Sequence, residues 1–191
     1  MNNLSMHILD IVQNSIAVGA TCIEVKVHVQ TDRNIFEIVI VDNGCGMDEE
    51  LLAHVTDPYT TTRTTRKVGL GLPLLKHTAE QANGFIKVYS AKNCGTKVYA
   101  VMQNDHIDRP GLGDIAGTIV LIAAANPKIE IKYIHQINEK KYIFDTQEVK
   151  KVLEDMPISD SNIRNYLKEM INENIQELYV MKHSGFTTSN L

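Results

Sequence analysis

The strongest constraint on the fold of this chain is an apolar run from Ile35 to Val41, which ends at Asp42. A segment of residues 23–29, in which apolar and polar side chains alternate, precedes this run, and the polar residues 30–34 separate the two. Alternation with a period of two is typical of a β-strand, and a short polar connection is typical of a turn. We therefore predict an antiparallel hairpin that places Asp42 at the end of a strand.

The rest of the chain contains both helical and strand patterns. Apolar residues recur at helical spacing from Leu4 to Val18, and Gly19 suits a left-handed C-terminal cap. Further helices are expected near residues 48–55, 73–82, 115–126 and 161–178, and another after Asp145, which with Glu148 could cap it. A second hairpin is expected over 85–102, and two strands near 129–133 and 142–144. This mixture predicts an α/β (α+β) fold.

Composition excludes several classes of protein. The chain has 191 residues, 43% of them hydrophobic, which is enough for one core and an appendage. Its net charge of −4 provides no basic field for nucleic acid. There is no apolar run of about 18 residues and no signal sequence, so we predict a cytoplasmic protein without membrane contact. The three cysteines are expected to be reduced thiols.

Asp10 and Asn14 are four residues apart and therefore lie on one face of the predicted first helix. An asparagine offers a neutral oxygen to Mg²⁺, an ion that is commonly shared with substrate phosphates. A carboxylate one turn away can orient or deprotonate a nucleophile. The alternative interpretation of Asp10 and Asn14 is a polar helix face in water.

Asp42 is followed by Gly44 and Gly46. Alternate glycines permit positive φ and allow the chain to pass close to a flat ring. A buried aspartate requires a hydrogen-bond donor, and the exocyclic amine of adenine is one candidate. The alternative is an ordinary turn, because Asp-Asn-Gly is a frequent turn sequence.

Gly69 and Gly71 precede a helix with Pro73 in its first turn. Free N–H groups at such a helix start suit a phosphate chain. Arg63 and Lys67 lie in the adjoining threonine-rich loop, which we expect to be mobile and to add positive charge near the γ-phosphate as a lid. The alternative is a flexible surface loop before a helix.

The order and spacing of these motifs carry more weight than any one of them. Asn14 precedes Asp42 by 28 residues, Asp42 precedes Gly69 by 27, and Gly69 precedes Thr96 by 27. In this arrangement the sequence resembles the GHKL superfamily, which includes gyrase, a group of heat-shock chaperones, histidine kinases and MutL. Asp10 to Thr21 and Val41 to Gly46 are most similar to MutL, whereas residues 57–63, 69–76 and 95–96 are closer to sensor histidine kinases.

The resemblance covers roughly residues 4–102 and implies a Bergerat-type two-layer sandwich that holds ATP between helices and a mixed, mainly antiparallel sheet. We expect this ATP-binding domain over residues 1–105, a small α+β extension over 106–181, and a disordered tail over 182–191. Carried over, the resemblance implies roles for seven residues: a magnesium ligand (Asn14), an adenine-reading carboxylate (Asp42), glycines of the base pocket (Gly44, Gly46), phosphate-binding glycines (Gly69, Gly71), and a side chain that backs Asp42 directly or through water (Thr96).

Two departures from the family pattern affect the expected reaction. Hydrolytic members of the superfamily carry glutamate where this chain has Asp10, so the carboxylate is one methylene shorter. Kinase-type glycine boxes often begin with a further glycine where Lys67 stands.

Three functions follow as hypotheses. The first is a stand-alone histidine-kinase-like enzyme that binds ATP and Mg²⁺ and transfers the γ-phosphoryl to a Ser or His of a separate protein, with Asp10 as the catalytic residue. The second is a slow ATPase that acts as a nucleotide-driven switch. The third is an ATP sensor without chemistry. The expected partners are ATP and a phosphoacceptor or regulatory protein, with homodimerisation through the last helix as a further possibility.

Overall fold

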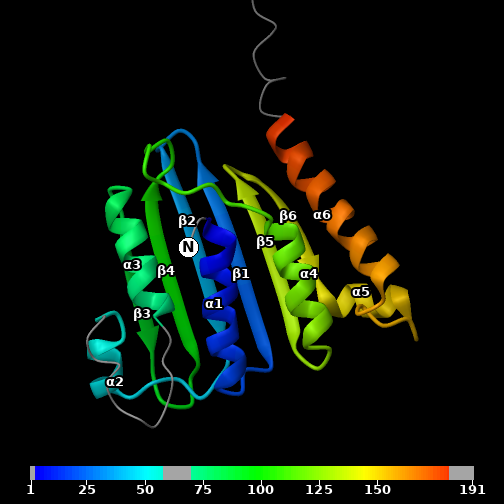
Figure 1. Ribbon diagram of the computed structural model, residues 1–191, viewed down its shortest axis with the longest axis horizontal. Coiled ribbons are helices and arrows are strands. Elements are labelled where there is room, and N and C mark those ends of the chain that lie inside the picture. Colours follow the sequence, from blue (N-terminus) through cyan, green and yellow to red (C-terminus); the bar gives the residue numbers. More distant parts are fainter. Residues whose placement is uncertain (1–2, 58–69, 181–191) are drawn as a thin grey trace, which may run out of the picture.

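Within residues 3–57 and 70–180, which the computed structural model describes, 6 strands form one sheet in the order β3-β4-β2-β1-β5-β6 (Figure 1). Neighbouring strands pair antiparallel except β1 and β5, which are parallel. The predicted mixed, mainly antiparallel sheet is therefore confirmed. The strands are β1 (Cys22–Gln30), β2 (Ile35–Asp42), β3 (Phe85–Ser90), β4 (Thr96–Gln103), β5 (Glu130–Ile137) and β6 (Lys140–Asp145).

The predicted first hairpin forms with Gln30 opposite Ile35 and Ile23 opposite Asp42. Alternate side chains of both strands are buried: Ile23, Val25, Val27 and Val29 from β1, and Phe36, Ile38 and Ile40 from β2. They all face the helices, because side chains alternate across a strand. This register carries Asp42 to the edge of the core.

Helices cover one face of the sheet, as predicted (Figure 1). α1 (Leu4–Ala17), α3 (Gly71–Gln81) and α4 (Ile115–Ala125) form the layer over the strands, and α6 (Ser161–Val180) packs on α4, β5 and β6. Two short helices, α2 (Glu49–His54) and α5 (Thr146–Leu153), lie beside β3 and β5 respectively. The hydrophobic core fills the space between the two layers.

Polar side chains begin four of these helices by accepting a hydrogen bond from a backbone N–H of the first turn, as is typical of N-caps. They are Asn3, Asp48, Asp114 and Asp145, which cap α1, α2, α4 and α5. Gly19 follows α1 at a φ of +82°, as its sequence position predicts. The apolar run after Asp114 is thereby confirmed as a helix.

The C-terminal elements continue the same sheet. The parallel β1–β5 ladder runs from Cys22 opposite Glu130 to Val29 opposite Ile137. The start of α1 is also tied to the segment before α4, because Leu4 N–H donates to the Gly111 carbonyl and Ser5 N–H to that of Leu112. The predicted division at residue 105 stays a prediction, and the tail 182–191 lies outside the described residues. In the described part of the chain, no helix has the length and apolar character needed to cross a membrane.

Candidate functional site

Asp42, at the end of β2, is a buried carboxylate with two fixed hydrogen bonds. Only 8% of the surface of Asp42 is exposed. The Ser15 hydroxyl donates to Oδ2 at 2.6 Å, and the Gly44 N–H donates to Oδ1 at 2.8 Å. A carboxylate has more than two acceptor positions, so Asp42 retains capacity for a ligand donor. Ser15 was not predicted, although it directly follows Asn14 and lies on the buried face of α1.

The loop after Asp42 is held to the start of β1 by Asn43. The Asn43 amide oxygen accepts from the Thr21 and Cys22 N–H groups, each at 2.9 Å, and its NH₂ group donates to the Thr21 hydroxyl at 2.9 Å. These three bonds satisfy most of the hydrogen-bonding groups of the amide. The loop that carries Gly44 and Gly46 is therefore pre-organised by the protein itself.

Two glycines beside Asp42 are required by close backbone packing. Gly46 has a φ of +64°, and a Cβ there would lie 1.9 Å from the Ala91 carbonyl oxygen. Gly95 has a φ of +77°, and its Cβ would lie 2.0 Å from the Asp42 carbonyl oxygen. At Gly44 a Cβ would lie 3.0 Å from Asp42 Oδ1. Packing alone thus accounts for glycine at 46 and 95, and the role of Gly44 and Gly46 in a base pocket stays a prediction.

Asp10 and the predicted phosphate-binding end of α3 meet. Asp10 and Asn14 are half-buried on α1, and α3 begins at Gly71 beside them. A Cβ on Gly71 would lie 2.2 Å from Asp10 Oδ2, so a side chain at this position would displace the carboxylate. The positive end of the α3 dipole lies next to Asp10, an arrangement that stabilises negative charge. The structure therefore brings Asp10 to the helix start that was predicted to bind phosphates.

His7 lies one turn before Asp10, between α1 and α3. It is buried, and its Nε2 atom lies 3.2 Å from the Thr78 hydroxyl of α3. Within the described residues its Nδ1 atom has no hydrogen-bond partner. Burial lowers the pKa of His7, and the nearby Asp10 carboxylate only partly opposes this shift. His7 is therefore a neutral residue of the helix interface.

Thr96 stands opposite Asp42 in the β2–β4 ladder. Its hydroxyl lies 3.0 Å from that of Ser90, which also donates to the Gly95 carbonyl and accepts from the Met47 N–H. In the part of the chain that the structure describes, no hydrogen bond joins Thr96 to the Asp42 carboxylate. Support of Asp42 by Thr96 through water stays a prediction, and Ser90 is a second hydroxyl that the sequence did not single out.

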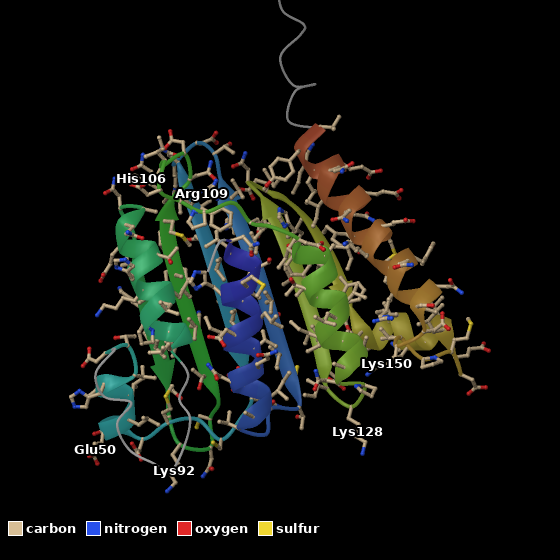
Figure 2. The ribbon with its side chains drawn as sticks, in the orientation of Figure 1. Glu50, Lys92, His106, Arg109, Lys128 and Lys150 are labelled. Carbon is tan, nitrogen blue, oxygen red and sulfur yellow. The ribbon has the colours of Figure 1, made fainter. Side chains whose placement is uncertain are left out.

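Three predicted site residues, Arg63, Lys67 and Gly69, lie outside the described residues. Lys92, in the turn after β3, and Glu50, on α2, lie at the same end of the molecule as Asp42 (Figure 2). Across residues 3–57 and 70–180, no three His, Cys, Asp or Glu side chains cluster closely enough to hold a metal ion. The oxygens of Asp10 and Asn14 fit Mg²⁺ only as part of a shell completed by phosphates and water.

Residues 2–106 match the family model described as "Histidine kinase-, DNA gyrase B-, and HSP90-like ATPase". The chain belongs to this family. The match spans α1 to β4 and includes Asp10, Asn14 and Asp42. The resemblance to the GHKL superfamily is thereby confirmed, and the chain carries a GHKL ATP-binding domain.

The curated relatives of this GHKL chain include sensor histidine kinases. It is 35% identical over 79 residues to the sensor histidine kinase YvrG of Bacillus subtilis. The aligned segment covers 39% of this chain and 14% of that protein. The chain spans only 14% to 16% of the length of the curated relatives it matches. The similarity therefore concerns the shared domain.

The GHKL fold is also found in the solved structures that this chain resembles. The ADP complex of the Aquifex aeolicus MutL ATPase domain matches with a TM-score of 0.50 and 13% identity over 88% of each chain. The N-terminal domain of a DNA repair protein matches with a TM-score of 0.53 and 16% identity, over 75% of this chain and 52% of that one. At these identities the likeness establishes the fold.

Proposed function

We propose that this GHKL protein binds ATP with Mg²⁺ at the Asp42 end of the sheet and transfers the γ-phosphoryl group to a Ser or His of a separate protein. The observation that carries the proposal is the contact between Asp10 and the start of α3 at Gly71. It joins a carboxylate that can position an acceptor to a helix start that can bind phosphates.

The Asp42 carboxylate supplies the adenine end of the proposed site. Ser15 and Gly44 hold it in place, and its free acceptor positions suit the exocyclic amine of adenine. Asn14, one turn from Asp10 on α1, offers its amide oxygen to Mg²⁺. When bound, the ion would neutralise phosphate charge. Gly71, together with Gly69, Arg63 and Lys67 of the preceding segment, is proposed to contact the phosphates.

Asp10 is proposed to orient the acceptor hydroxyl or imidazole and to accept its proton as the bond to the γ-phosphoryl forms. ADP leaves with the electron pair of the broken bond, so the transfer needs no co-reactant beyond the acceptor. The similarity to sensor histidine kinases supports transfer as the reaction. We propose that the acceptor lies on a separate protein.

A slow ATPase is the second candidate. The fold likeness to the MutL ATPase domain covers 88% of this chain and so extends beyond the residues that match the family model. Elements such as β5 and α6 would then transmit the nucleotide state. If Asp10 supports neither phosphoryl transfer nor ATP hydrolysis, the proposal that remains is an ATP sensor.

The test is incubation of the whole chain with γ-labelled ATP and Mg²⁺, with and without cell extract. Label on a second protein supports transfer, and free phosphate alone supports the ATPase. Asp10→Asn should keep ATP affinity and abolish the labelled product, because the amide retains the shape but cannot take a proton. Asp108→Asn, an exposed change, is the matched control. Tight ATP binding with no labelled product from the native protein would leave only the sensor.

A further inference from the structure

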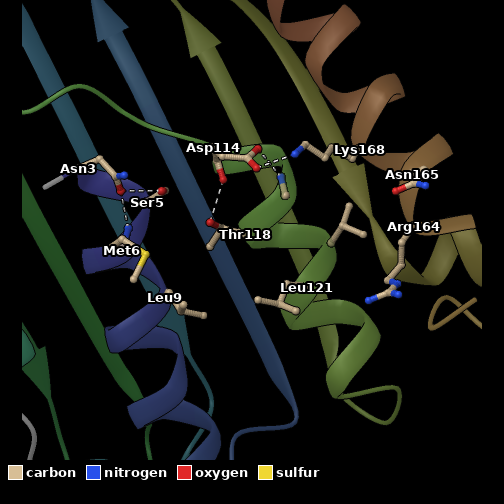
Figure 3. A pocket seen from close by; sticks show the side chains of 12 residues that line it. Asn3, Ser5, Met6, Leu9, Asp114, Thr118, Leu121, Arg164, Asn165 and Lys168 are labelled. Atoms are coloured by element: carbon tan, nitrogen blue, oxygen red, sulfur yellow. Dashed lines mark hydrogen bonds and ion pairs between the residues drawn. The ribbon is translucent and has the colours of Figure 1, made fainter. Parts of the chain in front are cut away.

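A groove on the outer face of the helix layer lies away from Asp42 and has no role in the function proposed above. It has a volume of about 490 Å³. Figure 3 shows α4 as its floor, α1 as one wall and α6 as the other. Met6 and Leu9 line it from α1, Thr118 and Leu121 from α4, and Arg164, Asn165 and Lys168 from α6.

The floor of the groove is apolar where a surface helix is normally polar. Thr118 is the one polar side chain among the 11 residues of α4, and its hydroxyl donates to the Asp114 carbonyl at 2.8 Å. Outward-facing positions of α4 are occupied by Gly117, Leu121 and Ala125. A helix that is hydrophobic on all sides is normally buried on all sides. The outer side of α4 therefore has the composition of a covered surface.

The apolar side chains of the two helices gather in the groove. Met6 is 46% exposed and Leu121 is 49% exposed, and Figure 3 shows the side chains of Leu9 and Leu121 pointing toward each other. The lining runs from Asn3, the cap of α1, to Leu9 and from Asp114, the cap of α4, to Leu121, which is about two helical turns on each. Such a trough between helices suits the apolar face of another helix.

The rim of the groove is basic. Arg164 and Lys168 lie one turn apart on α6 and both line it. Lys168 donates to Asp114 at 2.7 Å, so the one acidic side chain of the lining is already paired. Among the described residues, the exposed guanidinium of Arg164 has no hydrogen bond or ion pair. The chain as a whole carries a charge of −4, so this positive rim is a local feature.

We propose that this groove binds an acidic amphipathic helix of a partner protein. The apolar side chains of that helix, spaced i, i+4 and i+7, lie over Met6, Leu9 and Leu121, and a carboxylate on its flank pairs with Arg164. The inference goes beyond the proposed function and does not depend on nucleotide chemistry. The groove is joined to the nucleotide site by α1, since Met6 and Asp10 are one turn apart on that helix.

The experiment is selection of binders to the whole chain from a displayed library of helical 18-residue peptides with randomised exposed positions. Enriched peptides should combine leucines at i, i+4 and i+7 with aspartate or glutamate. A synthetic consensus peptide should lose about tenfold or more in affinity, measured by fluorescence anisotropy, on Leu121→Gln and on Arg164→Glu. Selection repeated on Arg164→Glu should enrich lysine and arginine instead.

Two control variants change an apolar side chain and a basic side chain outside the groove. Ile107→Gln removes an apolar side chain that is 94% exposed, and Lys128→Glu reverses an exposed charge outside the groove (Figure 2). Both should bind the consensus peptide as the native chain does. The proposal is overturned if no peptide is enriched, or if enriched peptides bind Leu121→Gln as tightly as the native chain. It is also overturned if light scattering finds a dimer that Leu121→Gln dissociates, because a second copy would then occupy the groove.

Discussion

At the scale of single residues, Asp42 has two fixed hydrogen bonds within the protein and a proposed role in recognising the base. Two of its acceptor positions are used by Ser15 and Gly44, which orient the carboxylate. A carboxylate held in this way recognises a hydrogen-bond donor and rejects an acceptor, because two acceptors facing each other are both left unpaired. In the proposed site, the hydrogen-bonding groups of Asp42 would therefore select the base.

Asp42→Asn should weaken ATP binding by about tenfold to 100-fold, because a hydrogen bond to a charged acceptor contributes about 1.5–3 kcal/mol. The variant should also lose its preference for ATP over inosine triphosphate, whose exocyclic carbonyl oxygen accepts a hydrogen bond where the exocyclic amine of adenine donates one. Calorimetric titration with both nucleotides measures the two effects. An unfolded variant would lose affinity for both nucleotides, so a change of preference cannot result from unfolding. An Asp42→Asn protein that still prefers ATP to inosine triphosphate contradicts the proposal that Asp42 reads the base.

His135 makes a separate, pH-dependent contribution to stability. It is buried, its Nδ1 atom lies 2.6 Å from the Tyr133 hydroxyl, and burial lowers its pKa to about 4. In the unfolded chain the imidazole of His135 has a pKa near 6.5. Between pH 4 and pH 6.5 the unfolded state therefore binds more protons than the folded state. His135 therefore makes its full contribution to the free energy of unfolding above pH 6.5. The free energy of unfolding should fall by about 3 kcal/mol as the pH drops to 4.

His135→Phe keeps a ring of similar volume without a titrating group, so the free energy of unfolding should lose most of this pH dependence. Urea unfolding at several values between pH 7 and pH 4 measures the slope. The buried His7 titrates in the same direction and should leave a residual slope. His77→Gln, on the exposed side of α3, is the control and should behave as the native chain does. Equal slopes for His135→Phe and the native protein would contradict the prediction.

Residue positions could be predicted from the sequence more readily than residue partners. The place of Asp42 follows from the apolar strand before it, and the shared face of Asp10 and Asn14 follows from helical spacing. The hydroxyls of Ser15 and Ser90 could not be foreseen, because a serine in a helix or strand carries no local sign of which distant group it will meet. Their partners exist only after the helices and the sheet have packed.

At the scale of elements, several connections have asparagine at the position where the backbone adopts positive φ. Asn34, Asn83, Asn93 and Asn138 all adopt positive φ in connections between elements, which is a conformation that asparagine tolerates better than most residues. The type of α4 could be predicted from its length and its Asp114 cap. Its exposed apolar side could not, because periodicity does not tell a buried helix from one that awaits a partner.

Three glycines allow the cost of positive φ to be separated from the cost of a clash. Gly19→Ala should lower the free energy of unfolding by about 1–2 kcal/mol, because φ is +82° and a Cβ would meet nothing within 4 Å. Gly46→Ala should cost about 3 kcal/mol or more, because its Cβ would also meet the Ala91 carbonyl oxygen.

Gly111→Ala is the matched control for both variants. A Cβ at position 111 meets nothing within 4 Å, and Gly111 is absent from the positive-φ residues. This change should leave the free energy of unfolding within about 1 kcal/mol of the native value or raise it slightly, because alanine restricts the unfolded chain. Denaturant midpoints of the three variants give the ranking, and a Gly46→Ala protein no less stable than Gly19→Ala would rule out the clash with Ala91 as an energetic factor.

At the scale of the whole molecule, the parallel pairing of β1 with β5 joins the two parts of the chain that the sequence predicted as a domain and an extension. This pairing could not be predicted, because local patterns identify strands but do not select their neighbours across about 100 residues. Ile119 and Ile131 from the C-terminal part belong to the same buried cluster as Ile8 and Val25 from the N-terminal part.

A fragment of residues 1–106 should therefore fail to unfold as a cooperative unit. Without β5 it exposes the edge of β1, and without α4 it exposes apolar side chains that the full chain buries, so aggregation is expected. The full chain should show a single cooperative transition by circular dichroism, and so should a control ending at residue 180, which keeps every described contact. A soluble 1–106 fragment with its own sharp transition near that of the full chain would instead establish residue 105 as a true domain boundary, because the β1–β5 ladder would then add little to the stability of the first domain.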